Sequence, residues 1–375
     1  MRPLLALKCS VGASIVCLGA WRGLADHTVQ CAKERQPEPQ AYAVGLIADV
    51  QWADVDDGWN FAHTSKRCFR GALNQLSRAV DWWDSQDLAA VAQLGDLIDG
   101  RNAALGASEA ALEGALKHLR RLRVPVLHTI GNHELYNFDR HTLSARLGHG
   151  KPDCFYFSFR AAEGHRIIVL DSFCESVNGW PEGDPRREAA LRTLAEKNPN
   201  DVMNSPNNWF VGLSGVERRF VPYNGGFGDA QIAWLRGELV AAAGARERVV
   251  VLSHGIIHPK ACDGTTMVWD YDKALHEVHS AGCVAAVVCG HDHKGGYHLD
   301  PHGVHHITLC SPLNEGDDGS AFGVLHMFAD HMELRGPSLA NLLPAHERLP
   351  AVLPSADDAC LRMRFEFPHS KRVHP

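Results

Sequence analysis

Potential metal ligands follow several apolar stretches of the sequence. The segment LIADVQWAD, residues 46–54, runs from apolar residues into Asp49 and then Gln51. Similar polar residues follow later apolar stretches, in GD at 95–96, GNHE at 131–134, SH at 253–254 and GHDH at 290–293. Sites in open α/β sheets form just beyond the carboxyl ends of strands. We therefore expect these five strand ends to converge on one cleft.

The residue types at these strand ends favour divalent metal ions. Asp, Gln and Asn supply hard oxygen donors and His supplies nitrogen, a mixed set that suits Mn²⁺, Fe or Zn²⁺ rather than a thiolate-loving ion. The candidate ligands are Asp49, Gln51, Asp96, Asn132, His254, His291 and His293. Seven ligands are too many for one ion. If one carboxylate bridges, they suit two ions about 3.5–4 Å apart, which orient a phosphoryl group, generate hydroxide and steady the departing oxygen.

Strand-like and helical patterns alternate along the chain and position these residues. Strand-like runs lie at 43–49, 88–96, 124–134, 154–159, 165–171, 248–254 and 283–291, and helical patterns at 69–83, 107–122, 229–239 and 271–282. The short RAAEG segment between two of these runs predicts a hairpin. Residues 303–310 and 321–336 indicate an antiparallel ribbon. The pattern predicts an α/β protein in which helices cover mixed sheet.

Composition indicates a globular protein. The chain has 375 residues, of which 45% are hydrophobic and 22% charged, which is ample for a large core. Its net charge is −7 and its basic residues are scattered, so we expect it to bind neither nucleic acid nor a membrane. An anionic substrate would need a local cation. The eleven Cys form no C-x-x-C pair, which favours reduced, mostly buried thiols.

The two ends differ from the region between them. Residues 1–40 read as an N-terminal extension, 41–336 as the catalytic domain, and the Pro-rich residues 337–375 as a tail on the surface or partly disordered. Residues 1–25 are basic around a short apolar run, which fits either an organellar targeting segment or a weakly ordered extension. We otherwise expect a cytoplasmic monomer.

The ordered motifs resemble a known superfamily. D-x-Q, GDLID, GNHE, SH and GHDH in this order resemble the calcineurin-like metallophosphoesterases, whose first motif is usually D-x-H. Residues 44 to about 336 are similar to the manganese-dependent ADP-ribose/CDP-alcohol diphosphatases. This similarity rests on the Gln of D-x-Q together with DDGWNF, LGDLIDGRNA, GNHELYNF, NSPNNW, YNGGF and GGYHLDPHGVHHI. The resemblance implies a four-layer αββα sandwich of mixed β-sheets. Asp292 and Lys294, in GHDHKGG, are local departures from the family pattern.

The resemblance also implies a role for each motif residue. One metal ion would be held by Asp49, Gln51 and His293, and the other by Asn132, His254 and His291. Asp96 would bridge the two ions. The resemblance makes His133 the general acid or the group that orients the leaving oxygen, a role that suits a pKa near neutrality. Asp99 would lie behind the metal ligands and hold one of them in orientation.

Aromatic and amide residues near the motifs are candidates for binding a nucleobase. These are Tyr136, Asn137, Phe138, Tyr223, Asn224 and Phe227. They could line a pocket that stacks an adenine or cytosine ring, and a purely structural role is an equal alternative. We expect Trp82 and Trp83 to pack a helix against the sheet. Most other His are expected at the surface or in the core, and His258 is left open.

The predicted activity is hydrolysis of a diphosphate bond by two divalent ions, most plausibly Mn²⁺, with Zn²⁺, Fe or Mg²⁺ as alternatives. ADP-ribose would give AMP and ribose 5-phosphate, and a CDP-alcohol such as CDP-choline would give CMP and a phosphoalcohol. Cyclic ADP-ribose and FAD are not ranked against them. The alternatives are another calcineurin-like phosphoesterase, acting on monoesters or cyclic nucleotides, and a nucleotide sensor without turnover. Gln51 and YNGGF argue against the first, and the complete ligand set argues against the second.

Overall fold

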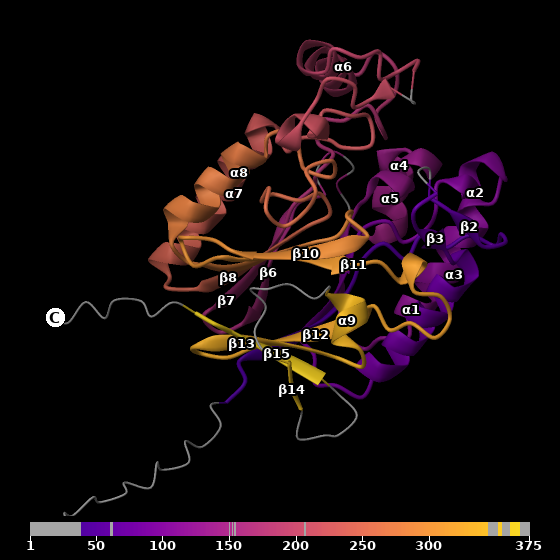
Figure 1. The fold of residues 1–375 in the computed structure, drawn as a ribbon. Helices are drawn as coiled ribbons and strands as arrows, with labels where there is room; N and C mark the ends of the chain where they lie inside the picture. The colour runs from indigo at the N-terminus through magenta and orange to yellow at the C-terminus, as the bar shows by residue number, and fades with distance from the viewer. Residues whose placement is uncertain are drawn as a thin grey trace, which may run out of the picture. The chain divides into compact units, whose positions relative to one another are not determined.

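Two β-sheets form the centre of the molecule (Figure 1). The computed structural model describes residues 39–60, 63–149, 151, 153, 155–205, 208–343, 352–354 and 361–367. The predicted N-terminal extension therefore lies outside the described residues, except for residues 39 and 40. None of the helices in the described part of the chain is long and apolar enough to cross a membrane.

The first sheet has seven strands. In spatial order they are β14 (Val352–Pro354), β15 (Leu361–Glu366), β13 (His331–Gly336), β12 (Phe322–Met327), β1 (Tyr42–Ile47), β4 (Ala90–Leu94) and β5 (Val126–Thr129). The neighbours β1, β4 and β5 run parallel, and the remaining pairs are antiparallel. The carboxyl ends of β1, β4 and β5 therefore lie at one edge of the sheet.

The second sheet has six strands. Their order is β10 (Lys294–Leu299), β11 (His305–Cys310), β9 (Val284–Cys289), β8 (Arg248–Ser253), β7 (His165–Val169) and β6 (Phe157–Ala162). The predicted β6–β7 hairpin is confirmed. The predicted antiparallel ribbon is confirmed only for β12 and β13; β11 lies in the other sheet, where it pairs antiparallel with β10 and parallel with β9. A short separate ribbon joins β2 (Gly58–Trp59) and β3 (Lys66–Arg67).

Helices cover the outer faces of the two sheets. Those that do so are α1 (Phe69–Trp83), α3 (Ser108–Leu119), α7 (Gly228–Gly244) and α8 (Tyr271–Ala281). The other helices of the described residues are α2 (Arg101–Ala104), α4 (Asn132–Asn137), α5 (Arg140–Leu147), α6 (Pro185–Lys197) and α9 (Leu339–Leu342), with 3-10 turns η2 (Gly215–Arg219) and η3 (Pro312–Asn314). One apolar cluster joins α1 and α3 to the first sheet, another joins α7 and α8 to the second, and a third lies between the sheets. The predicted four-layer αββα sandwich is confirmed.

Strand β1 shows why a central strand here is apolar throughout. Successive side chains of a strand point to opposite faces. Val44 and Leu46 pack between the sheets, whereas Ala43 and Ile47 pack against the helical layer. Gly45 faces Trp83, and a Cβ atom there would lie 2.9 Å from the indole ring. The predicted packing role of Trp83 is therefore confirmed.

The sequence analysis missed two parts of the fold. Strand β15 pairs with β13 beyond the expected end of the domain at residue 336, and Met363 and Phe365 are buried between the sheets. Helix α6 begins after Asp184, whose side chain accepts a hydrogen bond from the backbone of Arg186. This helix and the chain after it form a small apolar cluster of their own.

Candidate metal centre

Several predicted ligands occupy strained backbone positions just after the central strands. Asp49, Gln51, Asp96 and His291 have φ values of 54°, 45°, 56° and 71°. Non-glycine residues rarely adopt this left-handed region, and each such residue costs roughly 1–2 kcal/mol. Backbone bonds hold the turns in place, from Asp49 N to Gly95 O at 3.0 Å and from Gln51 N to Asp96 O at 2.8 Å. Strain of this kind is concentrated at functional sites.

Glycines beside the ligands provide space as well as conformational freedom. A Cβ atom on Gly131 would lie 2.0 Å from Asp96 Oδ1, and one on Gly290 would lie 2.6 Å from Asp49 Oδ2. Of the three glycines that precede predicted ligands, Gly95 has a positive φ of 90°. Gly95 therefore adopts a backbone conformation that favours glycine. The other two allow close approach of a carboxylate.

The first predicted ligand set comes together around Asp49. Its Oδ1 lies 3.5 Å from His293 Nε2 and has no hydrogen-bond partner, and its Oδ2 accepts from the backbone N–H of His291 at 2.8 Å. Gln51 Nε2 lies 3.0 Å from both Asp96 Oδ2 and His293 Nε2. The amide nitrogen therefore faces the cluster, whereas an oxygen was predicted there. Rotation of the amide exchanges the two atoms.

The second predicted ligand set comes together around Asp96. The ligand atoms of Asp96, His254 and His291 all lie within 4.8 Å of one another, and His254 Nε2 lies 3.5 Å from Asp96 Oδ2. The Oδ1 atom of Asn132 is buried without a hydrogen-bond partner. All four residues are buried. Both sets share Asp96, as a bridging role requires.

The two buried histidines of the second set have lone pairs that face each other. His254 Nδ1 lies 2.8 Å from the carbonyl of Leu94, and His291 Nε2 lies 2.7 Å from Asn224 Oδ1. Both of these oxygens can only accept, so each of these nitrogens carries the proton. The other nitrogens, His254 Nε2 and His291 Nδ1, then hold bare lone pairs only 2.9 Å apart. A divalent cation between them turns this repulsion into coordination.

The charges of the centre also fit a bound cation. Burial raises the pKa of Asp49 well above its usual value, and the nearby carboxylate of Asp96 raises it further. Burial lowers the pKa of His254 and, more strongly, those of His291 and His293, which keeps these rings neutral and able to bind metal. Two unpartnered oxygens, facing lone pairs and crowded carboxylates together fit a pair of divalent ions.

Glu134 supports the turn that carries Asp96, a role the sequence analysis did not assign. Its carboxylate accepts from the backbone N–H groups of Asp96 at 2.9 Å, Gly131 at 2.8 Å and Leu97. Burial, and then the charge of Asp96, raise the pKa of Glu134 to about 7. A Glu three residues after Gly131, the residue that caps α4, is the available sequence signal, because that spacing is typical of a capping box.

The predicted catalytic pair His133 and Asp99 lies beside the cluster. His133 Nδ1 is 3.2 Å from Asp99 Oδ2 and 2.8 Å from the backbone N of Gly100, while its Nε2 lies 3.9 Å from Asp96 Oδ2. The backbone N–H donates to Nδ1 of the neutral ring, whereas the charged ring can donate to Asp99. Burial lowers the pKa of His133, but the charge of Asp96 and the bond to Asp99 outweigh it and raise the pKa overall.

A cavity of about 740 Å³ opens over this centre. Aromatic residues line it, namely Trp59, Tyr136, Trp209, Phe210 and Tyr223. Cationic residues line it as well, namely Arg67, Arg101, Arg218 and Lys294. Arg67 Nη1 contacts His293 Nδ1 and lies 3.4 Å from Gln51 Oε1. The expectation that an anion would need local cations is thus met by residues that the sequence analysis did not identify for this role.

The predicted nucleobase residues divide into three groups. Tyr136 and Tyr223 line the cavity. Asn224 lies behind it and holds His291, and Asn137 holds the backbone carbonyls of Asp99 and His133. Phe138 borders a separate depression, and Phe227 is buried in the apolar cluster beneath α7. The cavity lining therefore includes neither Phe138 nor Phe227. Phe138 lies at the separate depression, and Phe227 packs in the apolar cluster.

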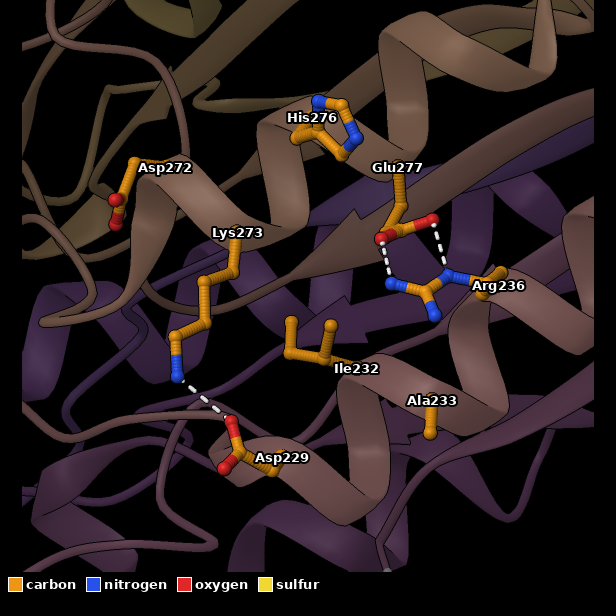
Figure 2. Close-up of a pocket in the computed structure, with 8 residues that line it drawn as sticks. All are labelled: Asp229, Ile232, Ala233, Arg236, Asp272, Lys273, His276 and Glu277. Carbon is orange, nitrogen blue, oxygen red and sulfur yellow. Dashed lines mark hydrogen bonds and ion pairs between the residues drawn. The ribbon is translucent and has the colours of Figure 1, made fainter.

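Another surface depression lies between α7 and α8 (Figure 2). Four of its charged side chains form two ion pairs, Lys273 with Asp229 at 2.6 Å and Arg236 with Glu277 at 2.6 Å. Ion pairs at the surface contribute little to stability. Because these four groups satisfy one another, we assign the chemistry to the strand ends.

Comparison with known proteins places this site in a family. The family model described as calcineurin-like phosphoesterase matches residues 42–295. A human protein named manganese-dependent ADP-ribose/CDP-alcohol diphosphatase is 38% identical over 326 residues, covering 80% of this chain and 94% of its own. An Arabidopsis thaliana protein of the same name is 37% identical over 304 residues, covering 80% of this chain and 95% of its own.

A solved structure supports the same assignment. The crystal structure of a dimetal phosphatase from Danio rerio has 32% sequence identity and a TM-score of 0.78, and the match covers 88% of this chain and 100% of that one. Its fold and its two metals agree with the four layers and the double ligand set described above. This chain belongs to the calcineurin-like phosphoesterase family, and within it to the group of manganese-dependent ADP-ribose/CDP-alcohol diphosphatases.

Proposed function

We propose that the protein hydrolyses the diphosphate bond of ADP-ribose, to AMP and ribose 5-phosphate, and of CDP-alcohols such as CDP-choline, to CMP and a phosphoalcohol. The names of the similar proteins support this substrate class. The observation that carries the proposal is the pair of facing lone pairs on His254 and His291, which sits beside the bridging carboxylate of Asp96. Such a centre suits phosphoryl transfer to water.

We assign the metal ligands as the sequence analysis predicts. Asp49, Gln51 and His293 would hold one ion, Asn132, His254 and His291 the other, and Asp96 both. Two bound Mn²⁺ ions would supply charge neutralisation for the phosphoryl group and a nucleophile at neutral pH. For Gln51 the assignment includes rotation of its amide, so that the oxygen faces the ion and the nitrogen takes the present position of Oε1, 3.4 Å from Arg67 Nη1.

The surrounding residues would bind and orient the substrate. Arg67, together with the other cations of the lining, can donate to the diphosphate oxygens, and Tyr136 and Tyr223 can pack against the base or ribose. In the charged ring, which Asp99 stabilises through Nδ1–H, His133 Nε2 carries a second proton and the ring lines the cavity. Nε2 can therefore donate its proton to the departing phosphate oxygen, which leaves the ring neutral.

A substrate panel tests this proposal. Purified protein with added Mn²⁺ is incubated with ADP-ribose, CDP-choline, cyclic AMP and p-nitrophenyl phosphate, and products are separated by ion-exchange chromatography. We expect AMP from ADP-ribose and CMP from CDP-choline at rates well above those of the other two compounds. Preferred cleavage of the cyclic nucleotide or the monoester would replace this proposal with the alternative phosphoesterase. Binding of ADP-ribose without product would favour a sensor.

The remaining expectations concern the state of the protein. We propose a monomer that binds small nucleotides and not nucleic acid, and a cytoplasmic location, with organellar targeting by residues 1–25 as the alternative. Light scattering of the purified chain and imaging of a tagged full-length chain test these two points.

A further inference from the structure

Ser311 is a buried serine directly after β11, a strand of the second sheet. Its hydroxyl donates a hydrogen bond to the backbone carbonyl of Asp49 at 2.7 Å. Asp49 lies just after β1, which belongs to the first sheet. The bond therefore joins the end of a strand in one sheet to a ligand-bearing turn of the other.

Ser311 is also bonded to the segment that carries His293. Its backbone N–H donates to the carbonyl of His293 at 3.2 Å. Lys294 and Cys310, the neighbours of these two residues, are partners across β10 and β11. Asp49 and His293 are both predicted ligands of the first ion, and Asp49 Oδ1 lies 3.5 Å from His293 Nε2. One residue thus holds the backbones of two ligands that come from different sheets.

The turn that follows Ser311 fixes the orientation of its hydroxyl. Ser311 caps the 3-10 turn η3, and its Oγ accepts from the backbone N–H of Leu313 at 3.1 Å. The carbonyl of Leu313 in turn accepts from the backbone N–H of Cys68 at 2.7 Å, at the start of α1. A hydroxyl has one proton to donate and two lone pairs. Because the Leu313 N–H occupies a lone pair, the proton of Ser311 is directed to the Asp49 carbonyl.

Asp49 depends on such support because its backbone is strained. Its φ of 54° lies in the left-handed region, which non-glycine residues rarely adopt. The carbonyl of Gly95 holds the N–H of Asp49 at 3.0 Å, and the Ser311 hydroxyl holds the carbonyl of the same residue. Strained conformations persist only where the surrounding structure imposes them. Loss of the second bond therefore allows Asp49 to relax, which would shift its carboxylate relative to His293.

We propose that Ser311 is a positioning residue for the first metal ion, acting through the backbones of Asp49 and His293. The inference rests on the ligand assignment proposed above. Loss of a partner that orients metal ligands lowers metal affinity by about 10–100-fold. Because the contacts of Ser311 reach ligands of the first ion, its loss should weaken binding of that ion far more than binding of the second. A residue that supports only the fold would weaken binding of both ions alike.

Titration of Mn²⁺ into the metal-free full-length protein tests the proposal independently of catalysis. Binding is followed by calorimetry and by electron paramagnetic resonance of free Mn²⁺, and urea unfolding of each metal-free protein is measured in parallel. Ser311→Ala removes both bonds of the hydroxyl, and two controls each remove one similar bond elsewhere. Thr308→Val, on the same strand, removes a buried hydroxyl that donates to the carbonyl of Ala261 at 2.9 Å. Ser176→Ala removes a buried hydroxyl that accepts from the backbone N–H of Asn178 at 3.0 Å.

We expect wild type to bind two Mn²⁺ ions, and Ser311→Ala to bind one of them near wild-type affinity and the other about 10–100-fold more weakly. Both controls should lose stability toward urea but keep the wild-type affinities for both ions. Wild-type affinities in Ser311→Ala, or an equal loss for both ions, would overturn the role of Ser311 and leave the ligand assignment intact. Fewer than two ions in wild type would contradict the assignment, and the inference with it.

A second variant covers the case in which Ser311→Ala does not fold by circular dichroism. In Ser311→Cys a thiol of similar size replaces the hydroxyl and donates only weakly. The affinity for one ion should then fall selectively, by less than in the alanine variant. Wild-type affinities for both ions in a folded Ser311→Cys protein would overturn the proposal.

Discussion

Asn224 tests the reasoning about the facing lone pairs most directly. Its Oδ1 accepts from His291 Nε2 at 2.7 Å, and its Nδ2 donates to the carbonyls of Arg219 at 2.8 Å and Thr265 at 2.7 Å. These two donations fix the orientation of the amide, so that its oxygen must face His291. The acceptor in turn fixes the proton on Nε2 and the lone pair on Nδ1, which is the atom that faces His254.

Two substitutions distinguish the acceptor role of the Asn224 amide from its donor role. Asn224→Leu removes the acceptor, so His291 loses the partner that sets its tautomer. Loss of such a partner weakens metal binding by about 10–100-fold, equivalent to about 1.4–2.8 kcal/mol. It also leaves two buried carbonyls without donors, each costing about 1–3 kcal/mol of stability. Asn224→Asp keeps the acceptor but loses the donors, so its stability should fall while its metal affinity stays within a fewfold of wild type.

The assay is a titration of Mn²⁺ into metal-free protein, followed by calorimetry and by activity on ADP-ribose, with urea unfolding measured in parallel. Tyr223→Phe, next in the chain and at the cavity wall, serves as a control that should keep wild-type affinity for Mn²⁺. Equal Mn²⁺ affinity in Asn224→Leu and wild type would refute the argument, because His291 would then bind metal without a fixed tautomer.

Three further predictions concern the metal centre and the neighbouring His133. Asp96→Asn should abolish turnover and reduce bound metal while circular dichroism stays unchanged, and near-normal metal content would remove the bridging role. His133→Ala should lower kcat by about 10²–10⁴-fold with both metals retained, the range for a lost acid–base group; loss of a metal would instead indicate ligation. Gln51→His should shift activation toward Zn²⁺ or Fe, because imidazole nitrogen is a softer donor than amide oxygen. Gln51→Ala should weaken that site for every metal, because alanine supplies no donor atom. Identical metal profiles in all three Gln51 proteins would leave this residue as a turn residue.

The alternation of strands and helices and the convergence of the strand ends follow from local sequence patterns, whereas the four layers were expected from the family resemblance. An apolar run followed by a polar residue marks both the strand and its carboxyl end, as at Asp49 and Asp96. The roles of side chains on irregular loops do not follow, because neighbouring positions there point in unrelated directions. Asn224 reaches back to His291, Tyr223 faces the cavity, and Phe227 enters the core. Arg67 was missed because its two-residue strand ends in no motif.

The β15 strand was missed for a different physical reason. In residues 361–366 alternate side chains, Met363 and Phe365, enter the core between polar neighbours, but the run is short and lies after Pro-rich chain. Its assignment as a strand depends on pairing with β13, which is a long-range contact. A local pattern of this length cannot distinguish such a strand from extended surface chain.

The strained turns explain why the ligands can crowd so closely. An unstrained residue after a strand would continue the extended direction and carry its side chain away from the neighbouring strand end. The left-handed turns at Asp49 and Asp96 reverse that direction, and the pairing of β1 with β4 continues past them to the bridge between Trp52 and Ile98. The strand pairing on both sides of these turns therefore holds their backbone in the strained conformation. The same turns bring buried carboxylates and bare imidazole nitrogens together, which lowers the stability of the metal-free protein. Bound cations offset this loss, because an ion that binds only the folded chain stabilises it, and an ion that binds more tightly stabilises it more.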